Sequence, residues 1–393
     1  MTLLYAFSFS LILIGIILLF LAVIFDKKKQ RKLKKHRNDK YAILIPARDE
    51  SKVIEGLLKS IKVQNNDMSN VYVIVENEED PTCDITKRYG ANIFVRPKPI
   101  RGRKGYALDE CIKDILKKKS YDLYFIFDAD NILDQSFISN MLKAWRQGYD
   151  VAIGYRNILN RDNVISCCSG LMFILLNLIM NKNIRMRTKQ PIMLSGTGFY
   201  ISGALIDKWK GFPFYTLTED YELSTYIYQN NISSIYVEDA IYYDEQPLTM
   251  KVSIKQRTRW VKGFFEKRTG KLKNEKYSFF TKIGVLPLVM LISGILLLFI
   301  FIFVDIILCL VNNINISLWK FILLGIPIYI YSIVLLVTLY TMNSEKDKIE
   351  IPKKLEKKVL LFMPIFLMGF IISFLRSISK KEVTWEKVEH FGK

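Results

Sequence analysis

The chain has 393 residues, of which half are hydrophobic and about a quarter are charged, and its formal net charge is +19. This composition excludes a disordered or collagen-like protein. The mean hydropathy is positive. The apolar residues gather in a few long runs instead of recurring with helix or strand periodicity, which argues against an ordinary soluble enzyme and indicates a membrane protein.

The first apolar run, residues 3–25, contains no charged side chain. A run of this length can cross the roughly 30 Å hydrocarbon core as a helix. A secretory signal would carry its positive charge in front, whereas here the basic residues follow at Lys27–Arg37. We therefore expect an uncleaved transmembrane helix over 1–26 and a basic linker over 27–40, with the chain after Lys27 in the cytoplasm.

Strand and helix patterns alternate from Tyr41 onward. Short runs rich in β-branched and aromatic residues predict strands at 41–45, 71–75, 93–95 and 123–127. Helical spacing of apolar residues over 53–61, and further helical segments between the later strands, predict a mainly parallel α/β sheet. Ligands of such sheets bind beyond the carboxyl ends of the strands, where Glu76–Asp80 and Asp128–Asp130 are found.

The sequence Asp128-Ala-Asp130 directly follows the fourth predicted strand. Two carboxylates two residues apart at a strand end would face the same side. Hard oxygen ligands of this kind suit Mg²⁺ or Mn²⁺ bridging to a diphosphate. The pattern is short, and a solvated turn after a strand is the alternative.

The segment Arg101-Gly-Arg-Lys-Gly-Tyr-Ala-Leu108 places three cations and two glycines before a predicted helix that starts near Tyr106. Glycine lets the backbone approach an anion, and a helix start adds a favourable partial charge. A pyrophosphate site fits this segment, and a solvated basic loop is the alternative. Neither a GxxxxGK[ST] loop nor a complete dinucleotide fingerprint occurs in the chain.

The chain has only two histidines, His36 and His390, and both lie outside the predicted α/β domain. The five cysteines show no CxxC spacing. A Ser/His/Asp triad, a Cys/His dyad, a zinc site and a disulfide framework are therefore not expected. Any general base in the α/β domain should be a carboxylate.

Three apolar runs follow the α/β domain, at 283–311, 318–342 and 359–375. We expect a membrane region over 283–375 with two or three spans, preceded by a basic interfacial segment at 251–282. The last run is short and contains Pro364, so we expect it to be re-entrant or interfacial, which keeps the basic tail 376–393 in the cytoplasm. A further run at 164–180 is interrupted by polar residues and is better explained as a buried or interfacial helix than as a span.

The excess positive charge lies beside the predicted spans. Segments 26–40, 251–282 and 343–393 hold 31 of the 57 Lys and Arg residues but only 11 of the 38 acidic residues. Anionic lipid explains this distribution better than nucleic acid does.

Three more motifs follow the Asp128–Asp130 pair: Leu194-Ser-Gly-Thr-Gly-Phe199, Thr218-Glu-Asp220 and Gln256-Arg-Thr-Arg-Trp260. In this order the motifs resemble those of membrane-integrated family 2 glycosyltransferases, the branch that includes cellulose, chitin, hyaluronan and poly-N-acetylglucosamine synthases and carries DxD, TED and QxxRW. The resemblance covers about residues 41–265 by motif and the flanks by architecture. It implies an α/β GT-A domain at 41–250, flanked by transmembrane helices, that uses a nucleotide-sugar donor with Mg²⁺ or Mn²⁺.

The resemblance also implies a role for each matched position. Asp220 would be the catalytic base for the acceptor hydroxyl, with Glu219 beside it, while Asp128 and Asp130 would hold ribose and metal. Glu76 departs from the family, because an aspartate that contacts the base usually stands there. The implied donor-binding residues are Pro46, Arg48, Glu50, Glu76, Asp80, Lys104, Asp128, Gln256 and Arg259, and the acceptor-binding residues are Gly196, Thr197 and Trp260.

Each of these roles has a simpler structural alternative. Trp260 could anchor an interfacial helix, since tryptophan favours membrane boundaries. Glu219 and Asp220 could cap a helix over 221–229. Arg257 and Arg259 could meet lipid headgroups instead of phosphate.

The expected function is that of an inverting glycosyltransferase at the cytoplasmic face of the cell membrane, in a multi-pass protein. It would move a sugar from a UDP-sugar to a glycan acceptor, with or without processive synthesis and export. One alternative is a single addition to a membrane lipid acceptor, and another is a catalytically silent subunit of an envelope complex. No nucleic-acid partner is expected.

Overall fold

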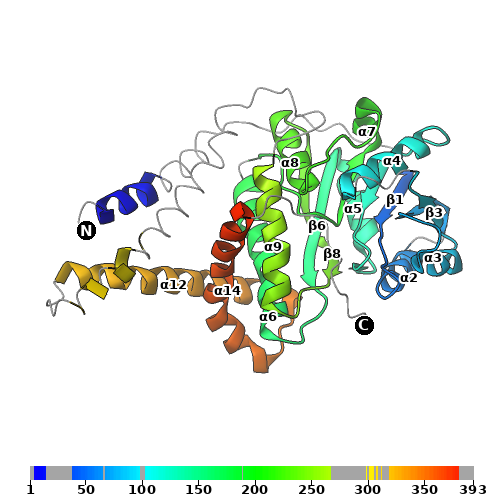
Figure 1. Ribbon diagram of the computed structural model, residues 1–393. Coiled ribbons are helices and arrows are strands. Elements are labelled where there is room, and N and C mark those ends of the chain that lie inside the picture. The colour runs from blue at the N-terminus through cyan, green and yellow to red at the C-terminus, as the bar shows by residue number, and fades with distance from the viewer. Residues whose placement is uncertain are drawn as a thin grey trace. The chain divides into compact units, whose positions relative to one another are not determined.

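An eight-stranded sheet forms the centre of the larger of two compact units in the computed structural model (Figure 1). This unit contains residues 28–275 and 341–393, and we call it the catalytic unit after its predicted role. The residues that the structure describes are 4–14, 38–64, 67–97, 102–187, 189–266, 298, 301–304, 307–308, 311 and 318–379, with backbone alone for 318–329. The strands are β1 (Tyr41–Pro46), β2 (Val71–Val75), β3 (Asn92–Val95), β4 (Leu123–Ile126), β5 (Ile132–Leu133), β6 (Val151–Ile158), β7 (Phe199–Ser202) and β8 (Ser234–Asp244).

The strand order is β3-β2-β1-β4-β7-β6-β8-β5. Strands β3, β2, β1 and β4 are parallel to one another, and β7 is antiparallel to both β4 and β6. Strand β8 is parallel to β6, while the short β5 is antiparallel to β8. The carboxyl ends of β1, β2, β4, β6 and β8 therefore share one edge of the sheet. The four strands predicted from the sequence are confirmed to within one residue at each end.

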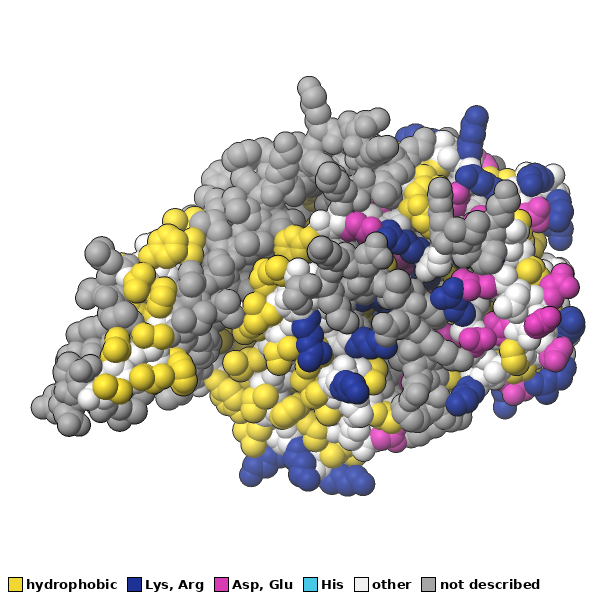
Figure 2. Space-filling view, viewed as in Figure 1, with side chains coloured by type: hydrophobic (Ala, Val, Ile, Leu, Met, Phe, Trp, Pro, Cys, Tyr) yellow, Lys and Arg dark blue, Asp and Glu magenta, His cyan; other side chains and the backbone are white. Residues whose placement is uncertain are grey.

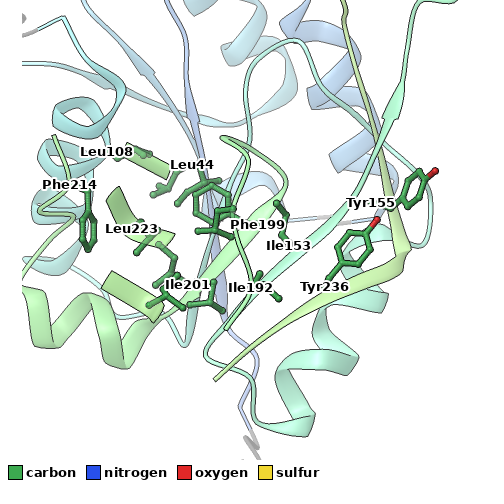
Figure 3. Packing of buried hydrophobic residues seen from close by; sticks show 14 of the residues in the cluster. Leu44, Leu108, Ile153, Tyr155, Ile192, Phe199, Ile201, Phe214, Leu223 and Tyr236 are labelled. Carbon is green, nitrogen blue, oxygen red and sulfur yellow. The ribbon is translucent and has the colours of Figure 1, made fainter. Parts of the chain in front are cut away.

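Strands β1 and β4 are buried along almost their whole length, as continuous apolar runs in sheets covered on both faces are. Because successive side chains point to opposite faces, Leu44 joins one core and Ile43 the other. Figure 3 shows the first core, where Leu44, Phe199 and Ile201 meet Phe214 and neighbouring apolar side chains.

Helices cover both faces of this sheet. Their bounds are α2 (Ile54–Gln64), η1 (Met68–Asn70), α3 (Thr82–Tyr89), α4 (Lys104–Leu116), α5 (Phe137–Gln147), α6 (Val164–Leu176), η2 (Asn177–Met186), α7 (Gly203–Trp209), α8 (Glu219–Gln229) and α9 (Met250–Phe265). Helices α2, α3, α4 and α8 lie where the sequence predicted helices. Helix α6 packs on β6, in line with its interpretation as a buried helix.

The last described helix, α14 (Lys353–Ser379), also belongs to the catalytic unit, together with the short α13 (Lys346–Ile349). Helix α14 lies along α9 and α6 (Figure 1). It begins six residues before the predicted run 359–375 and continues through Pro364 as a single helix, without the turn that a re-entrant segment needs. Its interfacial position stays a prediction.

A second compact unit contains residues 1–27 and 276–340. Within it, Tyr5 of the N-terminal helix packs edge-on against Phe301 at a ring distance of 6.4 Å and donates its hydroxyl to the Phe301 carbonyl oxygen. Helix α12 (Leu318–Ser344) covers the predicted run 318–342 and continues past the boundary of this unit. Most of the predicted run 283–311 and residues 15–25 of the first run lie outside the described residues, as do the linker up to Arg37, residues 267–282 and the tail from 380.

Two helices in the described part of the chain are long and apolar enough to cross a membrane, Val164–Met186 and Lys353–Ile378. Two-thirds of the apolar window in the first helix is buried in the protein, against one-third in the second. Length and composition are weak evidence for a span, and the burial of Val164–Met186 is what a core helix shows.

Candidate active site

The turns after β1 and β2 bring the first group of predicted donor residues together. Glu76 accepts a hydrogen bond from Arg48 Nε at 2.6 Å and lies 3.5 Å from Arg96 Nη1. Arg96 is buried and also pairs with Glu110 at 2.8 Å. The Glu76 carboxylate is therefore fixed by two arginines, of which the sequence had singled out only Arg48.

Asp80 ties the same two turns to the start of α3. Its Oδ2 accepts from the Asp49 backbone N–H at 2.8 Å, and its Oδ1 accepts from the Thr82 N–H at 2.9 Å. The Glu50 N–H donates to the Thr82 hydroxyl at 3.0 Å. Pro46, which ends β1, lies opposite Ile74 in the register, so all five residues predicted here lie at the adjoining carboxyl ends of β1 and β2.

Lys104, the first residue of α4, joins three of the predicted motifs. Its Nζ lies 2.5 Å from Asp128 Oδ1, 2.8 Å from the Gly196 carbonyl oxygen and 3.9 Å from Glu219 Oε1. Burial of the ammonium opposes its charge, but Asp128 and Glu219 outweigh this effect and raise the pKa of Lys104. Lys104 is thus a fixed cation inside the site, and the alternative of a solvated basic loop does not hold for it.

The turn that carries Asp128 and Asp130 is fastened by Thr197 and Asn131. The Asp128 N–H donates to Thr197 Oγ1 at 2.8 Å and to Asn131 Oδ1 at 3.2 Å. The Thr197 hydroxyl donates to Asn131 Oδ1 at 2.5 Å, and Asn131 Nδ2 lies 3.3 Å from Asp130 Oδ1. Thr197 is only 1% exposed, so its hydroxyl positions this turn, and its predicted contact with the acceptor stays untested.

The Asp128–Asp130 pair suits a divalent cation by its chemistry. The Asp128 side chain is 39% exposed, and the Lys104 ammonium already lies against it. In the described part of the chain, no group of three or more His, Cys, Asp or Glu side chains gathers at metal-binding spacing. Mg²⁺ is commonly held by one or two carboxylates together with substrate phosphates and water, so two aspartates fit such a site.

Glu219 and Asp220 lie in the first turn of α8. Burial raises the pKa of Glu219 to about 7, opposed by Lys104 and assisted by Asp220. Burial also raises the pKa of Asp220, against the backbone N–H of Tyr221 and the charge of Lys104. A buried carboxyl pair with raised pKa values is the kind of group that can take up a proton near neutral pH.

Gly196 faces this carboxyl pair. It has a φ of 87°, which favours glycine, and a Cβ built at this position would lie 3.8 Å from Asp220 Oδ2, the one atom within 4 Å among the described residues apart from its chain neighbours. Within the described part of the chain, Gly196 therefore leaves space beside the Asp220 carboxylate.

The residue that holds the loop before α8 is Glu222, which the sequence did not single out. Its Oε2 accepts from the Tyr215 N–H at 2.9 Å and from the Thr216 N–H at 3.1 Å. The residue at the N-cap, Thr218, makes no capping hydrogen bond with its side chain. The one sequence feature that could have pointed to Glu222 is its acidic side chain in the first turn of a predicted helix.

Helix α9 carries the QxxRW motif. The Trp260 ring packs edge-on against Phe173 of α6 at 5.4 Å, which leaves both its acceptor and its interfacial role open. The buried Nε of Arg259 has no hydrogen-bond partner among the described residues, and Gln256 lies one turn before Trp260 on the same helix. Arg257 is fully buried and donates Nη1 to the Phe366 carbonyl oxygen at 2.8 Å, so it does not meet lipid headgroups.

The end of α9 is tied to the loop before α8 and to the start of α4. Glu266 lies 2.7 Å from Arg103 Nη1 and accepts from the Leu217 N–H at 2.9 Å. A Cβ on Gly263 would lie 2.7 Å from a side-chain atom of Thr218, so this close approach requires glycine. The start of α4, the loop before α8 and the end of α9, just after the 256–260 motif, therefore meet around one place, although more than 100 residues separate the first from the others.

Comparison with known proteins agrees with this arrangement. The profile of the family described as "Glycosyltransferase like family 2" matches residues 37–263. The chain is 26% identical over 242 residues to "Probable glycosyltransferase YdaM" of Bacillus subtilis (strain 168), covering 57% of this chain and 55% of that protein. It is 31% identical over 131 residues to "Uncharacterized protein MJ1222" of Methanocaldococcus jannaschii, covering 33% of this chain and 52% of that protein. The chain thus spans about half the length of the curated relatives it matches.

Among solved structures, the chain is similar to mannosyltransferase PcManGT from Pyrobaculum calidifontis in complex with GDP-Man and Mn²⁺. The TM-score is 0.56 and the identity 14%, with 95% of this chain and 99% of that chain covered. At this identity the likeness shows the fold alone. With the family profile matching more than half of its length, the chain belongs to glycosyltransferase-like family 2, and its α/β domain has the GT-A-like fold.

Proposed function

We propose that the protein is an inverting glycosyltransferase that moves a sugar from a UDP-sugar to a glycan acceptor at the inner face of the membrane. The observation that carries this proposal is the position of Lys104, whose Nζ lies within 4 Å of side chains from both the Asp128 turn and α8. A cation between acidic motifs is suited to a substrate whose diphosphate must be neutralised while a nearby hydroxyl loses its proton.

In the proposed reaction the acceptor hydroxyl attacks the anomeric carbon of the donor from the side opposite the diphosphate. The new carbon–oxygen bond forms as the bond to the diphosphate breaks, and the diphosphate leaves with the electron pair. Asp220 takes the hydroxyl proton, and the single displacement inverts the anomeric configuration. Lys104 and Arg259 stabilise the charge that develops on the leaving group.

Asp128 and Asp130 would hold the divalent cation. Bound there, Mg²⁺ or Mn²⁺ would supply further positive charge to the diphosphate. PcManGT was solved with GDP-Man and Mn²⁺, which supports a metal and a nucleotide sugar for this fold but leaves the base of the nucleotide to be tested.

The assignment of Asp220 as base, with Glu219 as its neighbour, rests on the surroundings of the two carboxylates. Glu219 lies 3.9 Å from Lys104, whereas Asp220 faces the open space beside Gly196. An acceptor hydroxyl placed in that space would reach Asp220 without displacing the Lys104 contact. Arg259 supports the donor assignment for α9, because its buried Nε has no hydrogen-bond partner among the described residues.

The membrane location is supported by the surface of α14. Side chains exposed on this helix recur at spacings of three and four residues, and four lysines lie in its first two turns. Figure 2 shows the hydrophobic side chains gathered over α14, with Lys and Arg at the lower end of the patch. The exposed apolar residues are Leu361, Ile365, Met368, Ile372, Leu375 and Ile378, and the lysines are Lys353, Lys354, Lys357 and Lys358.

An apolar stripe with a basic end fits a helix that lies at an anionic lipid surface. We propose that the catalytic unit is cytoplasmic, that the unit of residues 1–27 and 276–340 is membrane-embedded, and that α14 lies at the interface. The same surface favours a second candidate function, a single sugar addition to a lipid acceptor.

The test is to incubate the detergent-purified protein with UDP-sugars and GDP-mannose, with Mg²⁺ or Mn²⁺, and to measure nucleotide release and product size. Metal-dependent release with a ladder of products supports polymer synthesis, and a single product supports the lipid acceptor. Absence of nucleotide release with every donor would refute both and leave the silent-subunit alternative.

A further inference from the structure

A buried ion pair lies at the carboxyl ends of β6 and β8, beside the turn that carries Asp128 and Asp130. Arg156 Nη2 and Nε lie 2.5 Å and 3.0 Å from Asp244 Oδ2. The exposed fractions of the two side chains are 12% and 4%. Neither residue belongs to a motif that the sequence had singled out.

The Asp244 carboxylate reaches the metal and donor side of the site. Its Oδ1 accepts from Asn131 Nδ2 at 2.8 Å. Asn131 in turn accepts from the Asp128 N–H and from the Thr197 hydroxyl. Because Asn131 directly follows Asp130 in the chain, the position of this turn depends on Asp244.

The Arg156 guanidinium reaches the acceptor side. Its Nη1 donates at 3.1 Å to the carbonyl oxygen of Ser195, the residue before Gly196. Its Cζ lies over the Phe173 ring, 3.6 Å from the ring centre, and Phe173 packs against Trp260. Arg156 therefore supports both the loop that faces Asp220 and the side chain predicted to stack on the acceptor.

Fold stability alone does not account for such a pair. Taking two charges out of water is costly, and buried ion pairs can often be replaced by apolar residues with little loss of stability. What apolar residues cannot reproduce is the set of directed hydrogen bonds, including the one from Gln246 Nε2 to Asp244 Oδ2 at 2.6 Å.

We propose that Arg156 and Asp244 are positioning residues that fix the Asp128–Asp130 turn relative to Gly196 and Trp260. The pair holds the donor and the acceptor at the separation that sugar transfer requires. This role rests on the proposed function, since it assumes that the donor binds on one side of Asp220 and the acceptor on the other.

The test compares Asp244→Asn, Arg156→Met and the double variant with a matched control at the opposite end of the same two strands. There, Ser233 Oγ donates to Asp150 Oδ2 at 2.7 Å, so Asp150→Asn makes the same change from carboxylate to amide in a polar contact between the β6 and β8 ends. For each full-length protein we would measure Tm, Mn²⁺-dependent nucleotide binding by calorimetry, and kcat and KM for transfer.

Asp244→Asn is expected to lower kcat and the Mn²⁺-dependent nucleotide affinity by about 10- to 100-fold, as the loss of a supporting partner behind metal ligands does. Asp150→Asn should leave both within about twofold of wild type for a comparable change in Tm, because it is remote from the site. The double variant, which leaves no unpaired buried charge, should regain Tm but not kcat.

A double variant that regains both Tm and kcat, or an Asp244→Asn protein that matches the control in kcat and nucleotide binding, would overturn the positioning role. Wild-type protein that binds nucleotide with Mn²⁺ but transfers no sugar would refute the proposed function, and the binding comparison between Asp244→Asn and Asp150→Asn would still decide the role of the pair. Wild-type protein that neither binds nor transfers would refute both.

Discussion

Lys104 shows how one residue can bring distant motifs into a single electrostatic unit. Its ammonium lies against Asp128, the Gly196 carbonyl oxygen and Glu219, which come from three separate segments. A buried cation without those partners would be strongly disfavoured, so the three segments and Lys104 stabilise one another. Changes at the neighbouring carboxylates should therefore alter proton affinities across the whole site.

The first prediction concerns the proposed base. Asp220→Asn should lower kcat by about 10²- to 10⁴-fold, because an amide cannot accept the hydroxyl proton. Nucleotide affinity, measured by calorimetry with Mn²⁺, should stay near that of wild type, since Asp220 is not proposed to touch the nucleotide. Asp239→Asn, an exposed position on β8, is the control and should keep full activity. Undiminished turnover by Asp220→Asn would remove Asp220 from the mechanism.

The second prediction concerns pH. Burial raises the pKa of both carboxyls of the pair, that of Glu219 to about 7. Since the base must be ionised, kcat/KM should fall as the pH drops through the raised pKa values of the pair, at a higher pH than the pKa near 4 of an ordinary carboxyl would give. The apparent pKa belongs to the pair and not to one residue.

Two variants test the sign of this pH effect. Glu219→Gln removes a negative neighbour of Asp220, so the acidic limb of the pH–rate profile should move to lower pH. In the wild type, the charge of Lys104 lowers the pKa values of both carboxyls. Lys104→Met removes this charge, so both pKa values should rise and the acidic limb should move to higher pH. Limbs that stay in place in both variants would contradict the coupling of these groups.

At the residue scale, short motifs in the sequence pointed to side chains that the structure places close together, while their catalytic roles stay predictions. Asp128, Glu219 and Asp220 were predicted together from motif order, and the structure brings the three side chains around Lys104. Asp244 and Arg156 could not be predicted this way, because 88 residues separate them and their pairing depends on the parallel register of β6 and β8. The motif that contains Thr197 does not reveal that its hydroxyl hydrogen-bonds to the Asp128 turn, and its predicted contact with the acceptor stays a prediction.

At the scale of elements, the packing of α9 on α14 centres on Arg257. Its guanidinium lies 4.3 Å and 4.9 Å from the ring centres of Phe366 and Phe370. Burial lowers the pKa of Arg257 to about 10, and no acidic partner for it occurs among the described residues. A Cβ on Gly369 would come within 2.9 Å of this guanidinium, so glycine at this position leaves the room that Arg257 occupies.

The third prediction follows from this contact. Arg257→Ala removes a fully buried side chain between two aromatic rings and should destabilise the fold by about 2–5 kcal/mol, as other large truncations in cores do. Hydrogen exchange should show lost protection in α9 and α14 before the central strands are affected, because the two helices lose their shared contact. Lys251→Ala, exposed on the same helix, should change neither quantity. Unchanged protection in Arg257→Ala would show that α14 is held by other contacts.

Strands β6 and β8 were not predicted from the sequence, and both for the same physical reason. Strand β6 contains Gly154, Arg156 and Asn157, and β8 contains Glu238 and Asp239, so neither presents an uninterrupted apolar run. Their pairing with each other and with β7 supplies the order that local propensity does not. The first six residues of α14 were not predicted, because the prediction followed the apolar run 359–375 and the lysines before it are not apolar. Lysine is nevertheless a good helix former.

At the scale of the whole molecule, the charge distribution and the two compact units both divide the chain into an apolar part and a part that contains the α/β domain. The unit of residues 1–27 and 276–340 includes the predicted first span, the run 283–311 and almost all of the run 318–342. Tyr5 and Phe301 show that these distant runs meet within it, which apolar composition alone could not predict. In contrast, α14 belongs to the catalytic unit, so the boundary of the predicted membrane region at 375 does not follow the packing of the chain.

The fourth prediction concerns the proposed lipid surface. Replacing Lys353, Lys354, Lys357 and Lys358 by Glu should weaken the attraction of α14 to an anionic bilayer, by about 1 kcal/mol for each positive charge removed near the surface. In proteoliposomes, wild-type transfer should be faster with anionic than with neutral lipid, and the variant should lose this difference. Reversing the exposed lysines Lys113, Lys117, Lys118 and Lys119, at the end of α4 and just after it, makes the same change in net charge and should leave the lipid dependence intact. An equal lipid dependence in both variants would place the anionic-lipid contact elsewhere in the chain, because only a local contact distinguishes lysines at α14 from those at α4.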